Sequence, residues 1–301
     1  MNRYWPLLLL LAAIWGASYV CIKLAVEDLE PAPMMAMRSL GAGIVLLAYL
    51  ALTTGGRHAV GELGRYWRPA LVLGTLNAAV PFWLIAWGEK HIDSSVAGIA
   101  QATVPIFTFL LAARFLPHEP VGTTRIVGVA IGFLGVAVLA GFDPEGGLLA
   151  ALGTLAVVLS SFFYGSAGVY GQHSVRTVPG PVLATGSMLA GGLILLPLAL
   201  FQLPTHAPDG ATIASVLVLT LLGTAFAQLI LFHMLRVFGS RRLSLVTYLI
   251  PGFAVFYGAV LLDEPITVAA LGGLVLILGG VALASGQRML RSRARVQEEP
   301  A

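Results

Sequence analysis

The chain has 301 residues, of which 58% are apolar and 10% are charged, and its formal net charge at pH 7 is +3. A soluble globular protein carries about 25% charged residues and about 45–50% apolar residues. The composition therefore excludes a cytosolic enzyme, a nucleic-acid-binding protein and a disordered protein, and the single Cys21 excludes a disulfide framework.

Ten apolar blocks follow one another along the chain, each bounded by charged residues, Pro or Gly. A helix needs roughly 20 apolar residues to cross the hydrocarbon of a bilayer, and the blocks have about that length. They do not alternate as the strands of a membrane barrel do, so the sequence predicts an all-α integral membrane protein with ten transmembrane helices. The blocks are Trp5–Val26, Ala32–Thr54, Pro69–Gly88, Ser94–Phe115, Gly122–Gly141, Leu148–Gly171, Pro181–Gln202, Thr212–Leu235, Leu243–Leu262 and Ile266–Ser285.

The segments between the blocks differ in charge. The N-terminus, the loops after even-numbered blocks and the C-terminus hold Arg3, Arg57, Arg65, Arg68, Arg114, Arg125, Arg176, Arg236, Arg241, Arg242, Arg288, Arg291, Arg293 and Arg295. The opposite loops hold Lys90 and most of the acids, which are Glu27, Asp28, Glu30, Glu89, Asp93, Asp143, Glu145, Asp209, Asp263 and Glu264. Cytoplasmic loops carry the excess of Lys and Arg, so we expect both termini in the cytoplasm.

Motifs of the first half recur in the same order in the second half. Each half has five predicted helices, so the second half enters the membrane from the opposite side and the halves form two inverted five-helix repeats. We place the first repeat at residues 1–145, the second at 146–286 and a basic cytoplasmic tail at 287–301. Alternating-access transporters have this architecture, and by analogy we expect a substrate site between the repeats. The paired motifs are Leu73-Gly74-Thr75 with Leu222-Gly223-Thr224, Pro105 with Pro251, His118-Glu119-Pro120 with Asp263-Glu264-Pro265, Gly128 and Gly135-Val136-Ala137 with Gly273 and Gly280-Val281-Ala282, and Trp15-Gly16 with Tyr164-Gly165.

These motifs resemble the EamA signature of the drug/metabolite transporter superfamily. The matching residues are Pro105, Glu119-Pro120, Gly128 and Gly135, then Pro251, Glu264-Pro265, Gly273 and Gly280, and, in the first two helices, Trp15-Gly16-Ala17-Ser18, Lys23, Pro33 and Arg38. The resemblance covers nearly the whole chain. It implies a ten-helix transporter of the cell inner (plasma) membrane, often an exporter of amino acids or other small metabolites, with the aromatic amino-acid exporters as the nearest comparison. The third block departs from the family's usual small residues and Tyr, because it reads Trp83-Leu84-Ile85-Ala86-Trp87-Gly88.

Ten residues within the blocks are candidates for binding substrate, because polar groups inside a membrane usually face the bundle interior. They are Trp15, Tyr19, Lys23, Asn77, Trp83, Gln101, Gln228, His233, Thr247 and Tyr248. The first three share one face of the first helix. Lys23 is either a cation aimed at a substrate carboxylate or an anchor that snorkels outward or pairs with Glu27. Arg38 has the same two interpretations but lies closer to the interface.

The other candidates also have two interpretations each. Gln101, Thr247 and Tyr248 are either hydrogen-bonding groups of the central cavity or contacts between packed helices. Trp83 either stacks on a substrate ring or packs in the core. His233 is either a titrating coupling group or a satisfied buried histidine.

The acidic residues do not fall deep within any block. Glu89, Glu119, Asp263 and Glu264 lie at helix ends, and Glu119 and Glu264 each precede a Pro that starts the next helix, a position suited to a helix N-terminus. Proton antiport through a buried carboxylate is therefore disfavoured, and we expect a facilitator-like exporter. Coupled transport, with Lys23 or His233 as the coupling group, remains an open alternative.

The sequence predicts a secondary transporter and not an enzyme, because the six His are spread over separate segments and no glycine-rich phosphate loop occurs. We expect export of small metabolites, above all aromatic or other apolar amino acids, by alternating access. The alternatives are a nucleotide-sugar or phosphate-ester carrier of the same fold and a proton-coupled drug exporter. We expect a small-molecule substrate, contact with the lipid bilayer, no nucleic acid, no cofactor and no metal, and a monomer or weak homodimer.

Overall fold

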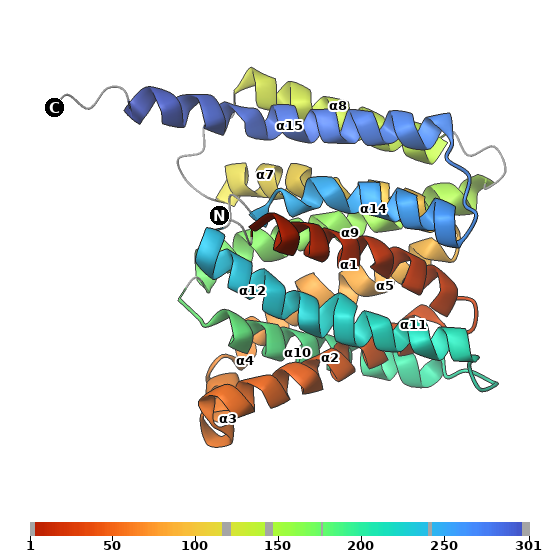
Figure 1. Ribbon diagram of the computed structural model, residues 1–301, viewed down its shortest axis with the longest axis vertical. Helices are drawn as coiled ribbons and strands as arrows, with labels where there is room; N and C mark the ends of the chain where they lie inside the picture. The colour runs from red at the N-terminus through yellow and green to blue at the C-terminus, as the bar shows by residue number, and fades with distance from the viewer. Residues whose placement is uncertain (1–3, 116–121, 142–146, 176, 240–242, 297–301) are drawn as a thin grey trace.

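The computed structural model describes residues 4–115, 122–141, 147–175, 177–239 and 243–296 (Figure 1). Every regular element in these ranges is a helix, so the prediction of an all-α chain is confirmed. The elements, with η for a π-helical segment, are α1 (Tyr4–Ala25), α2 (Pro31–Thr54), α3 (Gly56–Arg65), α4 (Trp67–Gly74), η1 (Thr75–Ala79), α5 (Val80–Glu89), α6 (Ser94–Gln101), α7 (Val104–Phe115), α8 (Thr123–Gly141), α9 (Gly147–Ser174), α10 (Gly180–Phe201), α11 (Gly210–Thr220), η2 (Leu221–Phe226), α12 (Ala227–Phe238), α14 (Val246–Leu261) and α15 (Val268–Val296).

Eight helical segments of the described chain are long and apolar enough to cross a bilayer. Three of them join consecutive elements: α4, η1 and α5 form Trp67–Glu89, α6 and α7 form Ser94–Phe115, and α11, η2 and α12 form Gly210–Phe238. Two shorter apolar stretches are Val246–Leu261 and Val268–Ala284. The chain is thus a multi-pass membrane protein.

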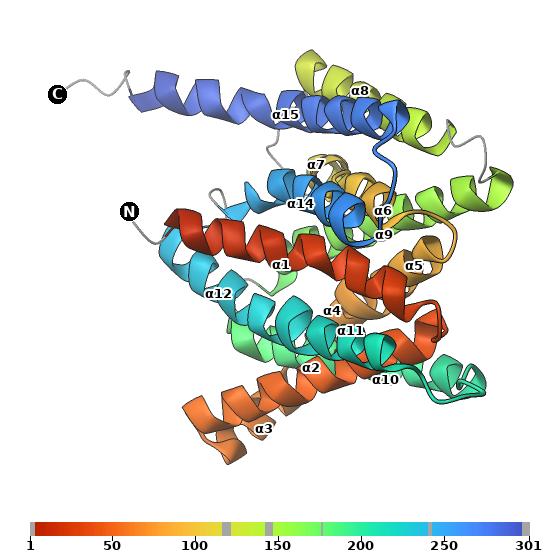
Figure 2. The ribbon, with the colours of Figure 1, turned by 45° about the vertical axis from the view of Figure 1, so that its right-hand side comes forward.

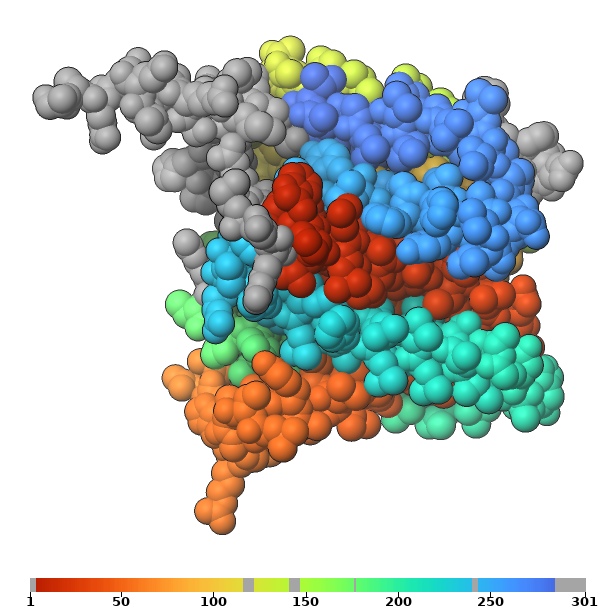
Figure 3. Space-filling view, in the orientation of Figure 1, coloured from red at the N-terminus to blue at the C-terminus, as the bar shows by residue number. Residues whose placement is uncertain are grey.

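Large apolar side chains cover the outside of the bundle. Leu52, Phe201 and Val268 are 88%, 89% and 88% exposed. A soluble monomer rarely exposes large contiguous apolar patches, whereas a helix in lipid satisfies its own backbone and can present apolar side chains outward. Figure 3 shows α1, α11 with α12, α14 and α15 side by side on one such face.

The two ends of the bundle carry opposite charge. The N-terminus of α1 and the helix α3 lie at one end, and the α1–α2, α10–α11 and α14–α15 connections lie at the other (Figures 1 and 2). We call the first the basic end, because it holds Arg57, Arg65, Arg68, Arg114, Arg125 and Arg236. The second is the acidic end, whose described acids are Glu27, Asp28, Glu30, Glu89, Asp93, Asp209, Asp263 and Glu264.

Glycines let pairs of helices approach closely. α8 packs along α15, and α2 packs along α10. A Cβ atom added to Gly280 would lie 2.5 Å from the carbonyl oxygen of Gly128, and one added to Gly135 would lie 2.9 Å from the carbonyl oxygen of Gly273. Because lipid gives no hydrophobic driving force between helices, such close backbone contact is a main source of attraction.

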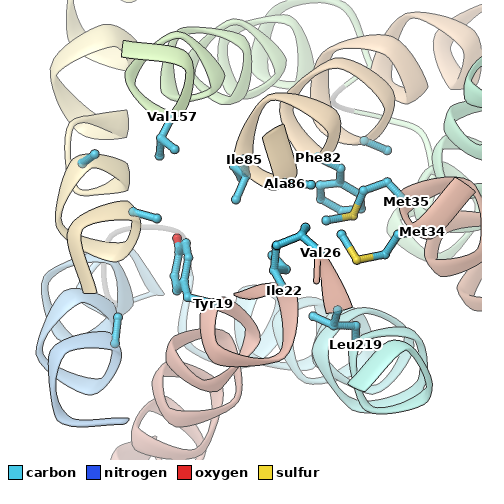
Figure 4. Packing of buried hydrophobic residues seen from close by; sticks show 14 of the residues in the cluster. Tyr19, Ile22, Val26, Met34, Met35, Phe82, Ile85, Ala86, Val157 and Leu219 are labelled. Carbon is cyan, nitrogen blue, oxygen red and sulfur yellow. The ribbon is translucent and has the colours of Figure 1, made fainter. Parts of the chain in front are cut away.

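The core lies where α1, α2, α5, α9 and α11 meet (Figure 4). Its fully buried members include Met34 and Met35 of α2 and Leu219 of α11. In Figure 4, Ile22 of α1 and Val26, which directly follows α1, face residues of α5. This packing joins the first and second halves of the chain.

Three spans are interrupted near their middle. η1 and η2 replace α-helical turns in the third and eighth spans, and the fourth span breaks between Gln101 and Val104. Pro105 lacks the N–H that would continue the helical hydrogen-bond ladder across this break. Irregular backbone at membrane depth is tolerated where it lines a cavity or is buried in protein. All three interruptions border the cavity described below.

Two helix starts at the acidic end are capped by carboxylates. The N–H groups of Ser94 and Ser95 donate to Glu264 at 2.7 and 2.9 Å, so Glu264 caps α6. Glu264 was predicted to precede the start of its own next helix, but α15 begins only at Val268, so that assignment was wrong. Glu119 lies outside the described residues.

Asp209 is the N-cap of α11. Its Oδ1 accepts a hydrogen bond of 2.7 Å from the N–H of Thr212, which holds the pKa of Asp209 below its usual range. The Oδ2 of Asp28 accepts from the N–H of Asp209 at 2.8 Å and from the hydroxyl of Thr212 at 3.0 Å. The α1–α2 connection is thereby tied to the start of α11.

Candidate functional site

A cavity of about 510 Å³ lies in the middle of the bundle. That volume falls within the range of small-molecule sites, which are mostly apolar with a few polar groups. Five aromatic side chains, supplied by both halves of the chain, form much of its wall: Trp15, Tyr19, Phe82, Tyr164 and Phe232. The space therefore suits a solute with an apolar or aromatic part.

Arg38 places a cation in this cavity. Its side chain is 6% exposed, and it lies on α2 with its guanidinium carbon 4.1 Å from the centroid of the Phe82 ring. Its Nε donates to Thr224 Oγ1 at 2.9 Å, while Thr224 donates its own proton to the carbonyl of Leu219. Among the described residues, no carboxylate lies within ion-pair distance of Arg38.

The missing counter-ion has a chemical consequence. A buried charge is costly unless it is paired, and Arg offers a planar fork that matches carboxylate or phosphate. The Nε–Thr224 bond and the Phe82 face hold the guanidinium in place, and its Nη1 lies 3.9 Å from the sulfur of Met35. The cavity can therefore receive an anionic group of a solute.

Gln101 is held in a defined orientation at the cavity wall. Its Nε2 donates to Ser161 at 3.2 Å, and its Oε1 accepts from the hydroxyl of Ser160 at 2.9 Å. Both serines lie on α9, so the amide also joins α6 to α9. Such an oriented amide offers a fixed donor and acceptor pattern to a bound solute.

Six of the predicted site residues lie in the cavity wall: Trp15, Tyr19, Asn77, Gln101, Gln228 and Thr247. Asn77 belongs to the π-helical segment η1, and Gln228 follows η2. π-Helical turns are frequent at functional sites because they re-aim side chains and disturb the hydrogen-bond ladder. The structure brings these six together, and their role in binding stays a prediction.

The other four predicted residues lie outside the wall. Trp83 and Tyr248 are partly buried and pack against the hydrophobic core. His233 has an exposed side chain on α12 and borders an outer pocket with Pro6 and Leu7 of α1, so its interpretation as a satisfied buried histidine was wrong. Its role as a coupling group stays a prediction.

Lys23 binds the end of a neighbouring helix. Its Nζ donates to the backbone carbonyls of Glu89 at 2.9 Å and of Ile92 at 2.8 Å. A cation at a helix C-terminus satisfies carbonyls that have no partner within the helix. Among the described residues, Lys23 makes no ion pair with Glu27, which was one of its expected partners.

Glu89 was placed at a helix end by the sequence, and the structure buries it completely. It is the last residue of α5, and its side chain is 0% exposed. Neither carboxylate oxygen has a hydrogen-bond partner among the described residues. The predicted position of Glu89 at a helix end is confirmed, and the burial of its side chain there was not foreseen from the sequence.

Sequence reasoning considered Arg38 as a cation for a substrate carboxylate without counting it among the ten site candidates, and it did not consider Glu89 for the site. The signal for Arg38 was its position in an apolar block with no acid four residues away. No described group of three or more His, Cys, Asp or Glu residues could hold a metal ion. The site is thus a cavity whose described wall has one cation, Arg38, together with the oriented amide of Gln101 and aromatic side chains.

Comparison with known proteins identifies relatives along the whole chain. The model of the EamA-like transporter family matches residues 3–141 and 151–286. An Escherichia coli protein named "Uncharacterized inner membrane transporter YedA" is 29% identical over 84% of this chain and 81% of its own length. A Salmonella typhimurium protein named "Probable amino-acid metabolite efflux pump" is 26% identical over 96% of this chain and 97% of its own length. A crystal structure with 20% identity matches at a TM-score of 0.66, covering 99% of this chain and 100% of that one, and it supports the fold alone.

Proposed function

Because this chain belongs to the EamA-like transporter family, we propose that it exports a small metabolite that carries a carboxylate and an apolar or aromatic group, as amino acids do. The observation that carries this proposal is Arg38, a buried cation in the cavity with no described carboxylate beside it. The aromatic walls supply the matching apolar surface. The relative named as a probable amino-acid metabolite efflux pump supports the same substrate class.

The proposed mechanism is alternating access between two inverted repeats at residues 1–145 and 146–286. The family model matches twice, at 3–141 and 151–286, which supports the division. Contacts also recur in pairs: a Cβ on Gly16 of α1 would meet Phe253 and Ala254 of α14, and a Cβ on Gly165 of α9 would meet Phe107 and Thr108 of α7. The π-helical segments η1 and η2 occupy corresponding spans.

The proposed orientation puts the basic end and both termini in the cytoplasm, in the inner membrane. The arginines of the basic end support it, since cytoplasmic loops carry the excess of positive charge. A relative named as an inner membrane transporter supports the location. The cavity lies within one chain, so the proposed transport unit is the monomer.

A phosphate-ester or nucleotide-sugar carrier is less well supported. A phosphate group carries more charge than a carboxylate, and several cations would have to face it. Arg38 is the only Lys or Arg in the described cavity wall, and the ammonium of Lys23 is bonded to two carbonyls.

The test is counterflow of radiolabelled amino acids into proteoliposomes that hold the unlabelled solute. We expect wild-type protein to exchange amino acids and to exchange their decarboxylated amines poorly. Arg38→Gln should raise the apparent KM by about 10- to 150-fold, because a hydrogen bond to a charged group contributes about 1.5–3 kcal/mol. The apparent KM of Arg38→Lys should lie between those of wild type and Arg38→Gln, because lysine keeps the positive charge but lacks the planar guanidinium fork.

Arg65→Gln is the matched control, because Arg65 lies at the basic end and its side chain is 71% exposed. It should leave the apparent KM unchanged. Equal exchange of amino acids and their amines, or an unchanged KM in Arg38→Gln, would overturn the proposal. Preferential exchange of phosphate esters would favour the other carrier class.

A further inference from the structure

Gly168 is the one glycine in the described cavity wall that helix packing does not explain. The other two glycines of this wall are Gly98 and Gly223. A Cβ added to Gly98 would overlap the Cβ of Ala254, and one added to Gly223 would lie 2.9 Å from the hydroxyl oxygen of Ser18. A Cβ added to Gly168 would have no described atom within 4 Å. Gly168 therefore leaves open space beside the cavity.

The fold of α9 does not require glycine at this position. Gly168 lies inside the helix, where glycine is less favourable than alanine, and it does not have the positive φ that side chains avoid. Alanine would fit there without a clash. Since the missing side chain brings the helix no benefit, its consequence lies in the cavity.

The paired motifs of the two halves assign an aromatic ring to the position that corresponds to Gly168. Trp15 pairs with Tyr164, so the residues four positions later, Tyr19 and Gly168, also correspond. All four line the cavity, and each pair shares one helix face. The first half thus contributes the ring of Tyr19, whereas the second half contributes no side chain at the matching position.

Gly168 and Arg38 lie toward opposite ends of the bundle. Arg38 follows the start of α2, at the acidic end, by about two turns. Gly168 precedes the end of α9 by about two turns, and α9 leads into α10 at the basic end. Leu183 and Ala184 near the start of α10, and Phe232 of α12, also line the cavity. A solute whose carboxylate meets Arg38 can therefore extend its other end toward apolar walls and the open space at Gly168.

We propose that Gly168 determines how large an apolar group the transported solute can carry. The inference rests on the proposed function, in which Arg38 binds the carboxylate. The apolar group then occupies the space that Gly168 leaves open, beside the ring of Tyr164 one turn earlier on α9. A side chain at position 168 would fill this space from the wall and exclude large solutes before small ones.

The test is counterflow of amino acids of increasing size, from alanine to phenylalanine and tryptophan. Gly168→Leu should raise the apparent KM for phenylalanine and tryptophan about 5- to 150-fold, the effect of overpacking, and leave that for alanine unchanged. Gly168→Ala should act in the same direction by a smaller factor. Its Tm should equal or exceed that of wild type, because alanine is the better helix former, and this separates a narrowed site from a damaged fold.

Gly171→Leu is the matched control. Gly171 lies on the same helix, a Cβ there also meets no described atom within 4 Å, and it is not in the described cavity wall. This variant should leave the apparent KM for every amino acid unchanged. If Gly168→Leu raised the KM for alanine and phenylalanine equally, or raised neither, the inference would be overturned and the proposed function would stand.

A second measurement does not depend on transport. In a Cys21→Ser background, the thiol of Gly168→Cys should react with a maleimide in detergent solution. Saturating phenylalanine should slow this reaction more than saturating alanine, because the larger side chain covers position 168. Equal rates with the two amino acids would overturn the inference. Absence of counterflow in wild type would overturn the proposed function, and the labelling would still decide whether a bound amino acid reaches Gly168.

Discussion

The hydrogen bonds around Gln101 allow a binding role to be separated from a packing role. Ser160 donates to the Gln101 amide from outside the cavity wall, so it can act on a solute only through that amide. If Gln101 binds the solute, Ser160→Ala should raise the apparent KM about two- to tenfold, because one hydrogen bond contributes about 0.5–1.5 kcal/mol. The maximal counterflow rate should change little.

Ser166→Ala on the same helix is the control for this substitution. The hydroxyl of Ser166 donates to the carbonyl of Phe162 in its own helix. It should leave the KM unchanged. A Ser160→Ala protein with wild-type KM and lowered thermal stability would show that Gln101 only joins α6 to α9.

Residues of the cavity wall could be predicted from the sequence where a local sequence pattern indicates them. Gln101 and Thr247 stand beside prolines on small, polar helix faces, and the structure puts both in the cavity wall. His233 has no such pattern beside it, and the structure leaves its side chain exposed on α12. Burial of Arg38 and Glu89 depends on neighbouring helices that close over the span ends, and hydropathy along one helix cannot report that.

At the scale of elements, the membrane-spanning segments were easier to predict from the sequence than the interruptions within them. The first eight apolar blocks match the observed spans within a few residues, since hydrophobic length is a property of each segment, whereas the last two correspond to the shorter apolar helices Val246–Leu261 and Val268–Ala284. The π-helical segments and the gap between α6 and α7 depend on packing around the cavity. Glu264 illustrates the limit, because its sequence position suggested the next helix and it caps α6, far away in the chain.

The contact between α8 and α15 gives a prediction at this scale. A Cβ on Gly280 would lie 2.5 Å from backbone atoms of Gly128 and Gly132, which cannot move aside as a flexible side chain would. Gly280→Ala should therefore destabilise the folded protein by about 1–3 kcal/mol, the usual effect of overpacking. Thermal unfolding in detergent micelles measures this as a lowered Tm.

The adjacent Gly279 supplies the control. A Cβ there meets nothing within 4 Å, so Gly279→Ala should keep or slightly raise the Tm, since Ala is the better helix former. Equal Tm values for the two variants would mean that α8 and α15 separate without cost. In that case the glycine contacts would not explain the pairing.

At the scale of the whole molecule, contacts at the acidic end join the two halves of the chain. Glu264 binds the start of α6, and Asp28 binds the start of α11. Ile22 and Ile85 line the cavity near the acidic ends of α1 and α5, so we expect these contacts to restrict access from that side. Alternating access requires that they break when the cavity opens toward that end.

Glu264→Gln should therefore favour opening at the acidic end. The amide oxygen can accept from only one of the Ser94 and Ser95 N–H groups, because the NH2 group is a donor, and the loss of about 1 kcal/mol shifts the equilibrium roughly fivefold. The measurement is the rate at which a membrane-impermeant maleimide labels Ile85→Cys from outside the cell, in a Cys21→Ser background. Because the acidic end is proposed to face outward, Glu264→Gln should raise this rate roughly fivefold, and Glu27→Gln should not. An unchanged rate would mean that Glu264 caps α6 without closing the bundle, whereas labelling from the cytoplasmic side alone would reverse the proposed orientation.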